Sequence, residues 1–506
     1  MTVPLRTSDP YAQGLALAAQ GRHAEAIERY EAALAHRPDD IRVLFALGNT
    51  ARALGLAGPA ENFFRRVLTI EPERIEALVN LANLLRSEGR FDAAQALLAP
   101  ALARHPATPE LWLTQGSVYR EMGDISRAAA HYREALALKP DYPAALGNLA
   151  DLLADDGEIE EALALYDRVL KREPQNAQAR LNRAVLHLLR GNLKEGWRDY
   201  AARLDFADKA PARDHRLPRW TGASLRKTRL LVMAEQGVGD QLMFASLIPE
   251  LCARAGREGG SIILECEPRL VPLFARSFPD ATVRPCRMET RGGRTTAHYD
   301  WLKAAGGANA AIELGSLPRF LRSDLSRFPV PHRYLTADAG ETRSWREKFG
   351  ARGPLIGVCW RSGKTGGART LQYSPLAAWA DFLRELPGTI VCTQYDATAE
   401  EVAELQTRSG REICVPQGLD QKNELDRACA MLSALDCVVS APTAVSWLAA
   451  GAGVPTFKIL YDTSWTSFGQ SFEPFASSCA LMMPKMRGDW ADAFAQAKAR
   501  IGTEVG

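Results

Sequence analysis

A period of 34 residues runs through the N-terminal part of the chain and constrains its fold more than any other feature. Small residues keep this step through five full units. Alanine recurs as Ala26, Ala60, Ala94, Ala128 and Ala162, and glycine as Gly21, Gly55, Gly89, Gly123 and Gly157. Proline recurs as Pro38, Pro72, Pro106, Pro140 and Pro174, and a large side chain as Tyr30, Phe64, Leu98, Tyr132 and Tyr166. Such a period indicates an array of stacked units rather than one globular core.

Each position has a physical role in a pair of antiparallel helices. Alanine fits where the helices approach closely, and the large side chain fills the neighbouring gap. Glycine permits the tight turn between the helices, and proline ends the unit because it cannot continue a helix. One unit cannot bury its apolar face alone, so we expect a superhelix with a concave groove. The pattern resembles the tetratricopeptide repeat, and a sixth, altered unit runs from Ala177 to about Asp205.

The groove of such an array is expected to bind an extended or helical protein segment. Asparagine amides on the first helix of each pair are suited to hold a peptide backbone. The candidates are Asn49, Asn80, Asn83, Asn148 and Asn182. The alternatives are an array that self-associates or is purely structural, with asparagines that are only solvated.

The pattern changes after a turn-rich linker at residues 211–221. Short β-rich runs separated by helical stretches predict parallel sheets covered on both faces. The expected strands are Arg229–Ala234, Ser261–Cys266, Ala281–Arg284, Leu355–Trp360, Thr389–Thr393, Asp436–Ser440 and Thr456–Leu460. The predicted organisation is a repeat domain at residues 1–207 and two Rossmann-like lobes at residues 208–340 and 341–506, an α plus α/β chain.

The composition of the chain limits the classes of partner that it is expected to bind. The 62 basic and 60 acidic residues nearly balance, which gives no electrostatic case for nucleic acid or for an anionic membrane. The nine cysteines have no C-x-x-C spacing, and no histidine pair offers a metal frame, so no metal or other cofactor is expected. The N-terminus has no apolar signal segment, and no apolar run has the length of a membrane span. These features predict a reduced, cytoplasmic protein.

Ligands of open parallel sheets bind beyond the carboxyl ends of the strands, so the loops there are candidate sites. The loop after the first strand contains Gly237 and Gly239, which let the backbone approach a ligand closely. Asp240 follows, near the expected start of a helix. Its carboxylate could accept the proton of an attacking hydroxyl, or it could simply cap the helix.

Two loops of the second lobe suit a phosphate. The loop after Trp360 carries Arg361, Ser362 and Lys364 among several glycines, although it lacks the first glycine of a Walker A loop. A mobile surface loop is the alternative. After Ser440, Thr443 stands where a helix can begin, so free backbone N–H groups there would receive a phosphate. An ordinary capped helix is the alternative.

The joined parts resemble the bacterial tetratricopeptide-repeat glycosyltransferases, distant relatives of the O-linked N-acetylglucosamine transferase and the heptosyltransferases. The most specific stretches are Gly191-Asn-Leu, Gly196-Trp-Arg-Asp-Tyr200, Trp220-Thr-Gly, Glu235-Gln-Gly-Val-Gly-Asp240, Gly315-Ser-Leu-Pro318, Gly357-Val-Cys-Trp-Arg-Ser-Gly363 and Ser440 with Thr443-Ala-Val445. This resemblance implies a GT-B fold and a nucleotide-sugar donor. It implies Asp240 as the general base, Arg361 to Lys364 and Gln394 on the donor side, and Thr443 with Ala444 at the donor phosphate.

Three positions depart from the family's pattern. Pro442 stands where relatives often have aspartate, Trp447 where a histidine is common, and Tyr395 where a lysine follows the glutamine. Fewer cations would fit a donor with one phosphate, such as a CMP-activated nonulosonic acid of the pseudaminic type, or they would mean lost catalysis. With this altered loop the chain is similar to flagellin glycosyltransferases of alphaproteobacteria, in which the repeats dock flagellin and a sugar is added to Ser or Thr.

Two other functions stay open at this point. The chain could be a non-catalytic repeat scaffold or flagellin chaperone with a degenerate transferase fold. It could also be a glycosyltransferase for a small saccharide or lipid acceptor.

Overall fold

The structure is a computed structural model and describes residues 9–206, 211–291, 294–329, 333–350, 353–363 and 372–504. The chain forms two compact units, Met1–Ala179 and Arg180–Gly506. The sequence-based division into three domains, with boundaries after residues 207 and 340, stays a prediction.

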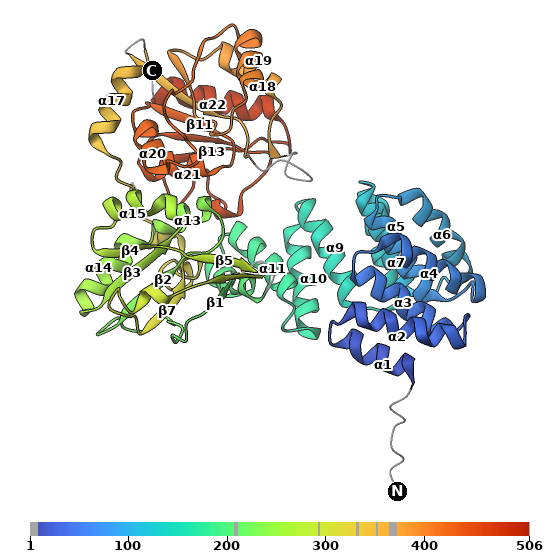
Figure 1. Ribbon diagram of the computed structural model, residues 1–506. Helices are drawn as coiled ribbons and strands as arrows, with labels where there is room; N and C mark the ends of the chain where they lie inside the picture. The colour runs from blue at the N-terminus through green and yellow to red at the C-terminus, as the bar shows by residue number, and fades with distance from the viewer. Residues whose placement is uncertain are drawn as a thin grey trace. The chain divides into compact units, whose positions relative to one another are not determined.

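The first unit is a solenoid of helix pairs, as the period predicts (Figure 1). A glycine with a φ between 73° and 87° stands at the turn inside each pair, so the left-handed conformation explains the repeated Gly21, Gly55, Gly89, Gly123 and Gly157. The repeated alanines and large side chains are all buried between the helices. The pairs are α1 (Pro10–Ala19) with α2 (His23–His36), α3 (Ile41–Ala53) with α4 (Ala57–Ile70), α5 (Ile75–Ser87) with α6 (Phe91–Arg104), α7 (Pro109–Glu121) with α8 (Ile125–Leu138), and α9 (Pro143–Asp155) with α10 (Ile159–Arg172).

The second unit contains a four-stranded parallel sheet in the order β4-β3-β2-β7. Its strands are β2 (Arg229–Met233), β3 (Ser261–Cys266), β4 (Ala281–Pro285) and β7 (Ala310–Glu313). The helices that follow them are α13 (Val238–Ala245), α14 (Ile248–Glu258), α15 (Val271–Ser277) and α16 (Pro318–Leu321). The three strands expected from the sequence are confirmed, and β7 was missed. A small sheet adds β1 (Ala212–Arg213), β5 (Met288–Arg291) and β6 (Arg294–Ala297).

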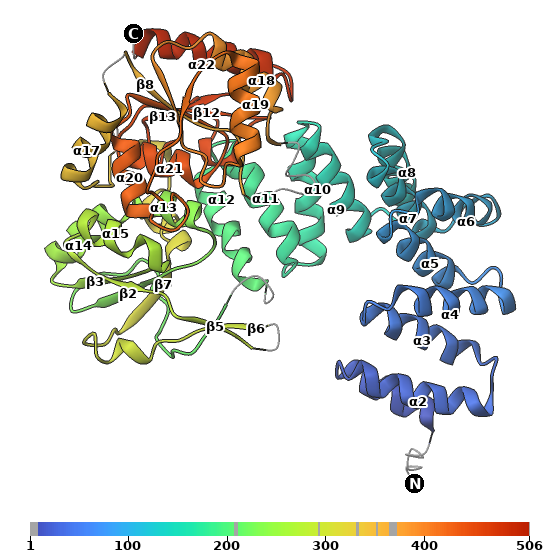
Figure 2. The same ribbon diagram turned by 45° about the horizontal axis from the view of Figure 1, so that its top comes forward.

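A second parallel sheet has six strands in the order β10-β9-β8-β11-β12-β13. These are β8 (Leu355–Cys359), β9 (Thr389–Cys392), β10 (Ile413–Cys414), β11 (Cys437–Ser440), β12 (Thr456–Ile459) and β13 (Cys479–Met482). The accompanying helices are α17 (Ala339–Phe349), α18 (Leu376–Arg384), α19 (Ala399–Ser409), α20 (Leu425–Ser433), α21 (Ala444–Gly451) and α22 (Trp490–Glu504). Apolar clusters on both faces bury the strands, with α20 and α21 on one side and α18 and α22 on the other (Figure 2).

Most of the altered sixth repeat belongs to this α/β unit. It comprises α11 (Ala177–Leu189), which spans the boundary between the units, α12 (Leu193–Tyr200) and the short η1 (Ala201–Asp205). Trp197 is 2% exposed and lies edge-on to aromatic rings from both sheet regions. The rings are Phe244 of α13 and Trp465, Phe468 and Phe475 of the segment after β12, with centroids 5.7 to 6.5 Å away. The sixth repeat therefore holds the two sheets together through one shared core.

Candidate functional site

Each large sheet has a topological switch point, and both switch points lie next to loops that were predicted as candidate sites. In each sheet the chain first proceeds outward on one side of a central strand and then continues on the other side. The switch lies between β2 and β7 in the first sheet and between β8 and β11 in the second. In open α/β sheets the ligand crevice lies beyond the carboxyl ends of such strands. The loops after β2, β8 and β11 thus form the candidate site.

Gln394 shapes the loop after β8. Its buried Oε1 accepts hydrogen bonds from the backbone N–H groups of Trp360 and Arg361, each at 3.0 Å. Its Nε2 donates to Asp396 Oδ1 at 2.6 Å. With both ends of its amide engaged, Gln394 fixes the backbone of this loop. Its place on a donor side stays a prediction.

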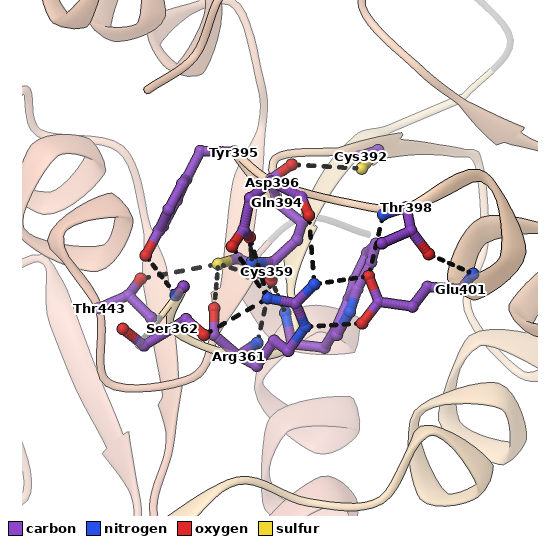
Figure 3. Close-up of polar contacts among 12 residues, drawn as sticks. Cys359, Arg361, Ser362, Cys392, Gln394, Tyr395, Asp396, Thr398, Glu401 and Thr443 are labelled. Carbon is purple, nitrogen blue, oxygen red and sulfur yellow. Dashed lines mark hydrogen bonds and ion pairs between the residues drawn. The ribbon is translucent and has the colours of Figure 1, made fainter. Parts of the chain in front are cut away.

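Arg361 is held between two carboxylates (Figure 3). Its Nε lies 2.6 Å from Glu401 Oε1, and its Nη1 lies 3.0 Å from Asp396 Oδ2. The hydrogen bond to Glu401 is the main reason that the pKa of this guanidinium is raised. Its charge is therefore largely balanced within the protein. This arrangement was not predicted from the sequence, although the capping box formed by Thr398 and Glu401 follows a recognisable pattern.

The turn after Arg361 is stabilised by a tyrosine. Ser362 is half-buried, and the phenol of Tyr395 accepts the backbone N–H of Gly363 (Figure 3). Tyr395 thus stabilises this turn. It occupies the position at which a lysine follows the glutamine in the glycosyltransferases that the sequence resembles. Lys364 lies outside the described residues.

The loop after β11 leads into α21 through a threonine cap. Thr443 Oγ1 accepts the backbone N–H of Val445 at 3.2 Å and lies 3.3 Å from the hydroxyl of the buried Ser440. The Cys359 thiol of β8 lies 3.6 Å from the same oxygen. Burial raises the pKa of this thiol to about 11, so it is neutral. The first turn of α21, which begins at Ala444, opens directly beside the end of β8.

The loop after β2 contains a backbone position that favours glycine but holds Gln236, with a φ of +59°. Strained positions of this kind gather at functional sites. Gly237 caps α13, and Asp240 Oδ2 accepts the Gly237 N–H at 3.1 Å. Burial raises the pKa of the Asp240 carboxyl, and the nearby Glu235 adds to this effect. Asp240 is therefore both a helix cap and a carboxylate of increased basicity.

The loops of the two sheets meet. A Cβ built on Gly239 would lie 3.8 Å from Ala444 Cα and 3.7 Å from Trp447 Cδ1. The beginnings of α13 and α21 are thus in contact, and both views show these helices side by side (Figures 1 and 2). This contact brings Asp240 and Thr443, predicted separately, to one place in the fold.

A buried ion pair beneath α21 was not expected from the sequence. Lys458 Nζ lies 2.6 Å from Glu473 Oε1 and 4.0 Å from the centre of the Trp447 ring. Both charged side chains are almost fully buried. The sequence signal for it is a lysine within the buried strand Thr456–Ile459. A second buried pair joins Arg203 of η1 to Glu235, at 2.6 Å, and ties the sixth repeat to the loop after β2.

A cavity of about 480 Å³ opens near the ends of β2 and β7. Its lining includes the apolar side chains of Leu181, Leu204, Phe206 and Pro211. It also includes the polar or charged side chains of Arg203, Arg213, Glu235, Gln236 and Glu313. This combination suits a polypeptide segment, because an apolar side chain and a polar backbone can be accommodated together.

The candidate asparagines lie on the first helices of their pairs, as expected. Asn49 is on α3, Asn80 and Asn83 are on α5, Asn148 is on α9, and all four are half-buried. Asn80 Nδ2 donates to Asn49 Oδ1 at 2.8 Å, and Asn148 Nδ2 donates to Ser117 Oγ at 3.4 Å. These amides therefore link neighbouring repeats in addition to any contact with a peptide. Asn182 lies on α11.

Comparison with known families identifies the class of the first part of the chain. Tetratricopeptide-repeat models match residues 79–143, 119–181 and 153–196, and a TPR repeat model matches residues 14–55. The chain thus contains tetratricopeptide repeats and continues into an α/β unit with two parallel sheets. No helix in the described part of the chain combines the length and apolar character needed to cross a membrane.

The chain is related to protein FlbA of Caulobacter vibrioides. The two are 33% identical over 319 residues, which are 62% of this chain and 53% of FlbA. The chain therefore spans about half the length of this curated relative. Because the matched stretch is longer than the repeat region, the similarity extends into the α/β unit.

Two solved structures are similar to part of the chain. A thermophilic TPR protein of Thermus thermophilus is 29% identical and covers 35% of this chain and 97% of its own, with a TM-score of 0.32. Yeast Tom70 is 23% identical and covers 36% of this chain and 39% of its own, with a TM-score of 0.33.

Proposed function

We propose that the chain is a protein O-glycosyltransferase of the GT-B type that transfers a sugar from a nucleotide-activated donor to Ser or Thr of a protein. The observation that carries this proposal is the contact of Gly239 with Ala444 and Trp447. It joins the loops beyond two switch points, one in each parallel sheet. A nucleotide sugar bound at such a place has its phosphate beside one sheet and its reacting carbon beside the other.

The chemistry assigns a role to each loop. The backbone N–H groups at the start of α21 receive the donor phosphate, because the first N–H groups of a helix lack partners within it. The acceptor hydroxyl oxygen forms a bond to the anomeric carbon while the bond from that carbon to the phosphate oxygen breaks. The hydroxyl proton passes to Asp240, whose raised pKa makes it a better base than a solvated aspartate. The electron pair of the broken bond leaves on the phosphate.

The local charge favours a donor with a single phosphate. Arg361 is balanced by Asp396 and Glu401, and Lys458 by Glu473. Neither of these cations is therefore left to neutralise the second phosphate of a diphosphate sugar. We therefore propose a CMP-activated nonulosonic acid of the pseudaminic type, which has a single phosphate, as the donor.

The repeats would select the acceptor protein. Solenoids of helix pairs present long concave surfaces to extended or helical segments. The amides of Asn83 and of the linked Asn49, Asn80 and Asn148 retain hydrogen-bonding capacity beyond the bonds described here. We propose flagellin as the acceptor, on the basis of the resemblance to flagellin glycosyltransferases.

The direct test is transfer in vitro. The full chain is incubated with flagellin and either CMP-pseudaminic acid or UDP-N-acetylglucosamine, and the intact mass of flagellin is measured. We expect a sugar adduct with the CMP donor. Asp240→Ala should lower the rate at least a hundredfold, the lower end of general-base effects, while flagellin binding persists. Asp280→Asn, which changes an exposed carboxylate, is the matched control. No adduct with either donor would contradict the proposal.

A non-catalytic scaffold is the second candidate, and one observation favours it. Asp240, Arg361 and Gln394 are each engaged within the protein. A protein that kept the transferase fold but lost catalysis would also have these residues bonded to one another and to the backbone. In that case flagellin would bind the repeats with unchanged affinity in Asp240→Ala, and no donor would yield an adduct.

A further inference from the structure

The cavity of about 480 Å³ near the ends of β2 and β7 opens beside the carboxylate proposed as the base. Gln236 lines it, and the next residue, Gly237, donates its N–H to Asp240 Oδ2 at 3.1 Å. Burial raises the pKa of the Asp240 carboxyl, and Glu235, which also lines the cavity, adds to this shift. The volume is within the range of about 300–1,000 Å³ that ligand pockets have. A group bound in this cavity is therefore a near neighbour of a hydroxyl that Asp240 deprotonates.

The charged side chains of the described lining are engaged within the protein. Arg203 pairs with Glu235 at 2.6 Å, and both are buried. Glu313 pairs with Arg219 at 2.8 Å. These two pairs leave each lining carboxylate beside a guanidinium of the chain itself.

The other arginine of the described lining is also engaged. Arg213 Nη2 donates to Ala234 O at 2.6 Å, and its Nη1 lies 3.5 Å from Glu265 Oε2. The cavity thus offers paired charges of both signs rather than an excess of one sign. A phosphate or a carboxylate is poorly matched here, because a charge that leaves water needs a partner of its own. The matching ligand is uncharged.

The rest of the lining is apolar and accessible. Four side chains from α11, η1 and the residues that follow η1 are half-buried, so part of each surface is open to a ligand. Burying such surfaces against another apolar side chain is favourable. The four are Leu181, Leu204, Phe206 and Pro211.

Gln236 adds a group suited to a peptide backbone. It is exposed, and its Nε2 donates to the Tyr200 hydroxyl at 3.2 Å. This bond holds the amide in place and leaves a second N–H and a carbonyl oxygen with capacity for a ligand. A backbone C=O and N–H match these two groups. The backbone φ of +59° at Gln236 is a strained value of the kind that occurs at binding sites.

We infer that this cavity binds the acceptor polypeptide at an uncharged, apolar residue directly next to the Ser or Thr that is modified. That residue packs on the four apolar side chains, and its backbone bonds to the Gln236 amide. The identity of the ligand rests on the proposed transfer, since the place of the cavity beside Asp240 puts the acceptor hydroxyl there. Acceptor sites with a charged neighbour on this side are excluded, because that charge would lose water without gaining a partner.

The test uses the full chain and blocked hexapeptides with a central serine. Photoleucine, a leucine analogue with a diazirine, stands directly before or directly after the serine, and crosslinked positions are mapped by mass spectrometry. We expect at least one of the two peptides to crosslink at Leu181, Leu204, Phe206 or Pro211. An excess of the same peptide with leucine should suppress these crosslinks, whereas peptides with aspartate or lysine at that position should not. Alanine in place of the serine should leave crosslinking unchanged.

A charge placed in the cavity gives a change of preference that loss of folding does not produce. Leu204→Asp should lower crosslinking of the photoleucine peptide roughly tenfold, about the effect of losing the burial of one leucine side chain. It should also make the lysine peptide a better competitor than the aspartate peptide. Met486→Asp introduces the same charge at an apolar residue that is 69% exposed in the same unit, and it should behave as the wild type does.

The outcomes separate this site from the transfer itself. Sugar transfer to flagellin with crosslinks only outside the cavity would overturn the inference and leave the transfer standing. Crosslinks in the cavity without any transfer would support a peptide site there and contradict the transferase. Equal competition by the aspartate peptide would overturn the inference. So would suppression by acetyl-leucine methylamide as strong as that by the leucine peptide, since the site would then suit a small apolar molecule.

Discussion

At Asp240, one substitution distinguishes the effect of the buried charge on stability from the effect of the hydrogen bond. Asp240→Asn keeps an oxygen to accept the Gly237 N–H and removes a charge that burial disfavours. Because the folded-state pKa is raised, the protonated carboxyl stabilises the fold below the ordinary aspartate pKa of about 3.9, and this contribution is lost as the pH rises through the folded-state value. We therefore expect the Tm of the variant to exceed that of the wild type by ~1–3 °C at pH 7 and to converge with it near pH 3. Scanning calorimetry between these pH values measures the difference.

The opposite result has a clear meaning. If Asp240→Asn were less stable by a constant amount at every pH, the cap would outweigh the buried charge, and the raised pKa would not contribute to stability. Asp280→Asn, at an exposed site, should change the Tm at neither pH.

Residue types were predictable at the site, but their partners were not. Gly237, Asp240 and Thr443 could be placed from the rule that ligands lie beyond the ends of parallel strands. The pairing of Arg361 with Asp396 and Glu401 depends on residues 35 and 40 positions away in the chain. A sequence pattern with a period of two or four residues contains no information about such contacts.

At the scale of helices, the close approach within a repeat gives a matched pair of substitutions. A Cβ on Gly48 of α3 would lie 2.6 Å from Phe64 Cε1, whereas a Cβ on Gly147 of α9 would meet no atom of the described residues within 4 Å. Gly48→Ala should reduce the free energy of unfolding by about 1–3 kcal/mol, because the packed ring must move. Gly147→Ala should increase it by about 0.5–1 kcal/mol, because alanine favours the helix interior. Urea unfolding followed by circular dichroism measures both.

These two substitutions control for each other. Each adds one methyl group to a helix, so a gain in stability in both would mean that helix propensity outweighs the contact with Phe64. A loss in both would contradict the expected gain at Gly147. Ala82 already occupies the position equivalent to Gly48 one repeat later, where the facing side chain is the smaller Leu98.

Helices and strands could be predicted where a long repeat or a run of apolar residues marked them in the sequence. The 34-residue period located every turn glycine of the first five repeats, and the expected second-lobe strands correspond to β8, β9, β11 and β12 within a residue at each end. The strands missed in the two large sheets are β7 and β13, with four residues each, and β10, with two. Length alone does not explain this, because the predicted β9, β11 and β12 also have four residues each. Pairing with a neighbour in the sheet, rather than local sequence, makes these segments strands.

At the scale of the whole molecule, we expect the sixth repeat to determine which fragments can fold. Its sequence suggested the end of the solenoid, yet Trp197 and Tyr200 pack with Phe244, Trp465 and Phe475 in the core of the α/β unit. The sequence could not reveal this, because a buried aromatic in a repeat looks the same whether the next repeat or another domain covers it.

Two fragments test that role. A fragment of residues 180–506 retains Trp197, and we expect it to be monomeric and to unfold in one cooperative transition. A fragment of residues 208–506 exposes Phe244, Phe468 and Phe475, which the aromatic ring of Trp197 covers in the full chain. Loss of one buried tryptophan alone costs about 3–5 kcal/mol, a large part of the stability of a typical domain. We therefore expect the shorter fragment to bind a hydrophobic dye and to aggregate.

Trp197→Ala in the full chain distinguishes the ring from the rest of the repeat. It should lower the Tm of the α/β unit while the helical signal of the first five repeats melts as in the wild type, because those repeats have their own core. If residues 208–506 proved as stable as residues 180–506, the sixth repeat would be an appendage of the solenoid rather than a structural part of the α/β unit. The contacts of Trp197 with rings from both sheet regions predict the opposite, since removal of the indole leaves a void that neither sheet region can fill alone.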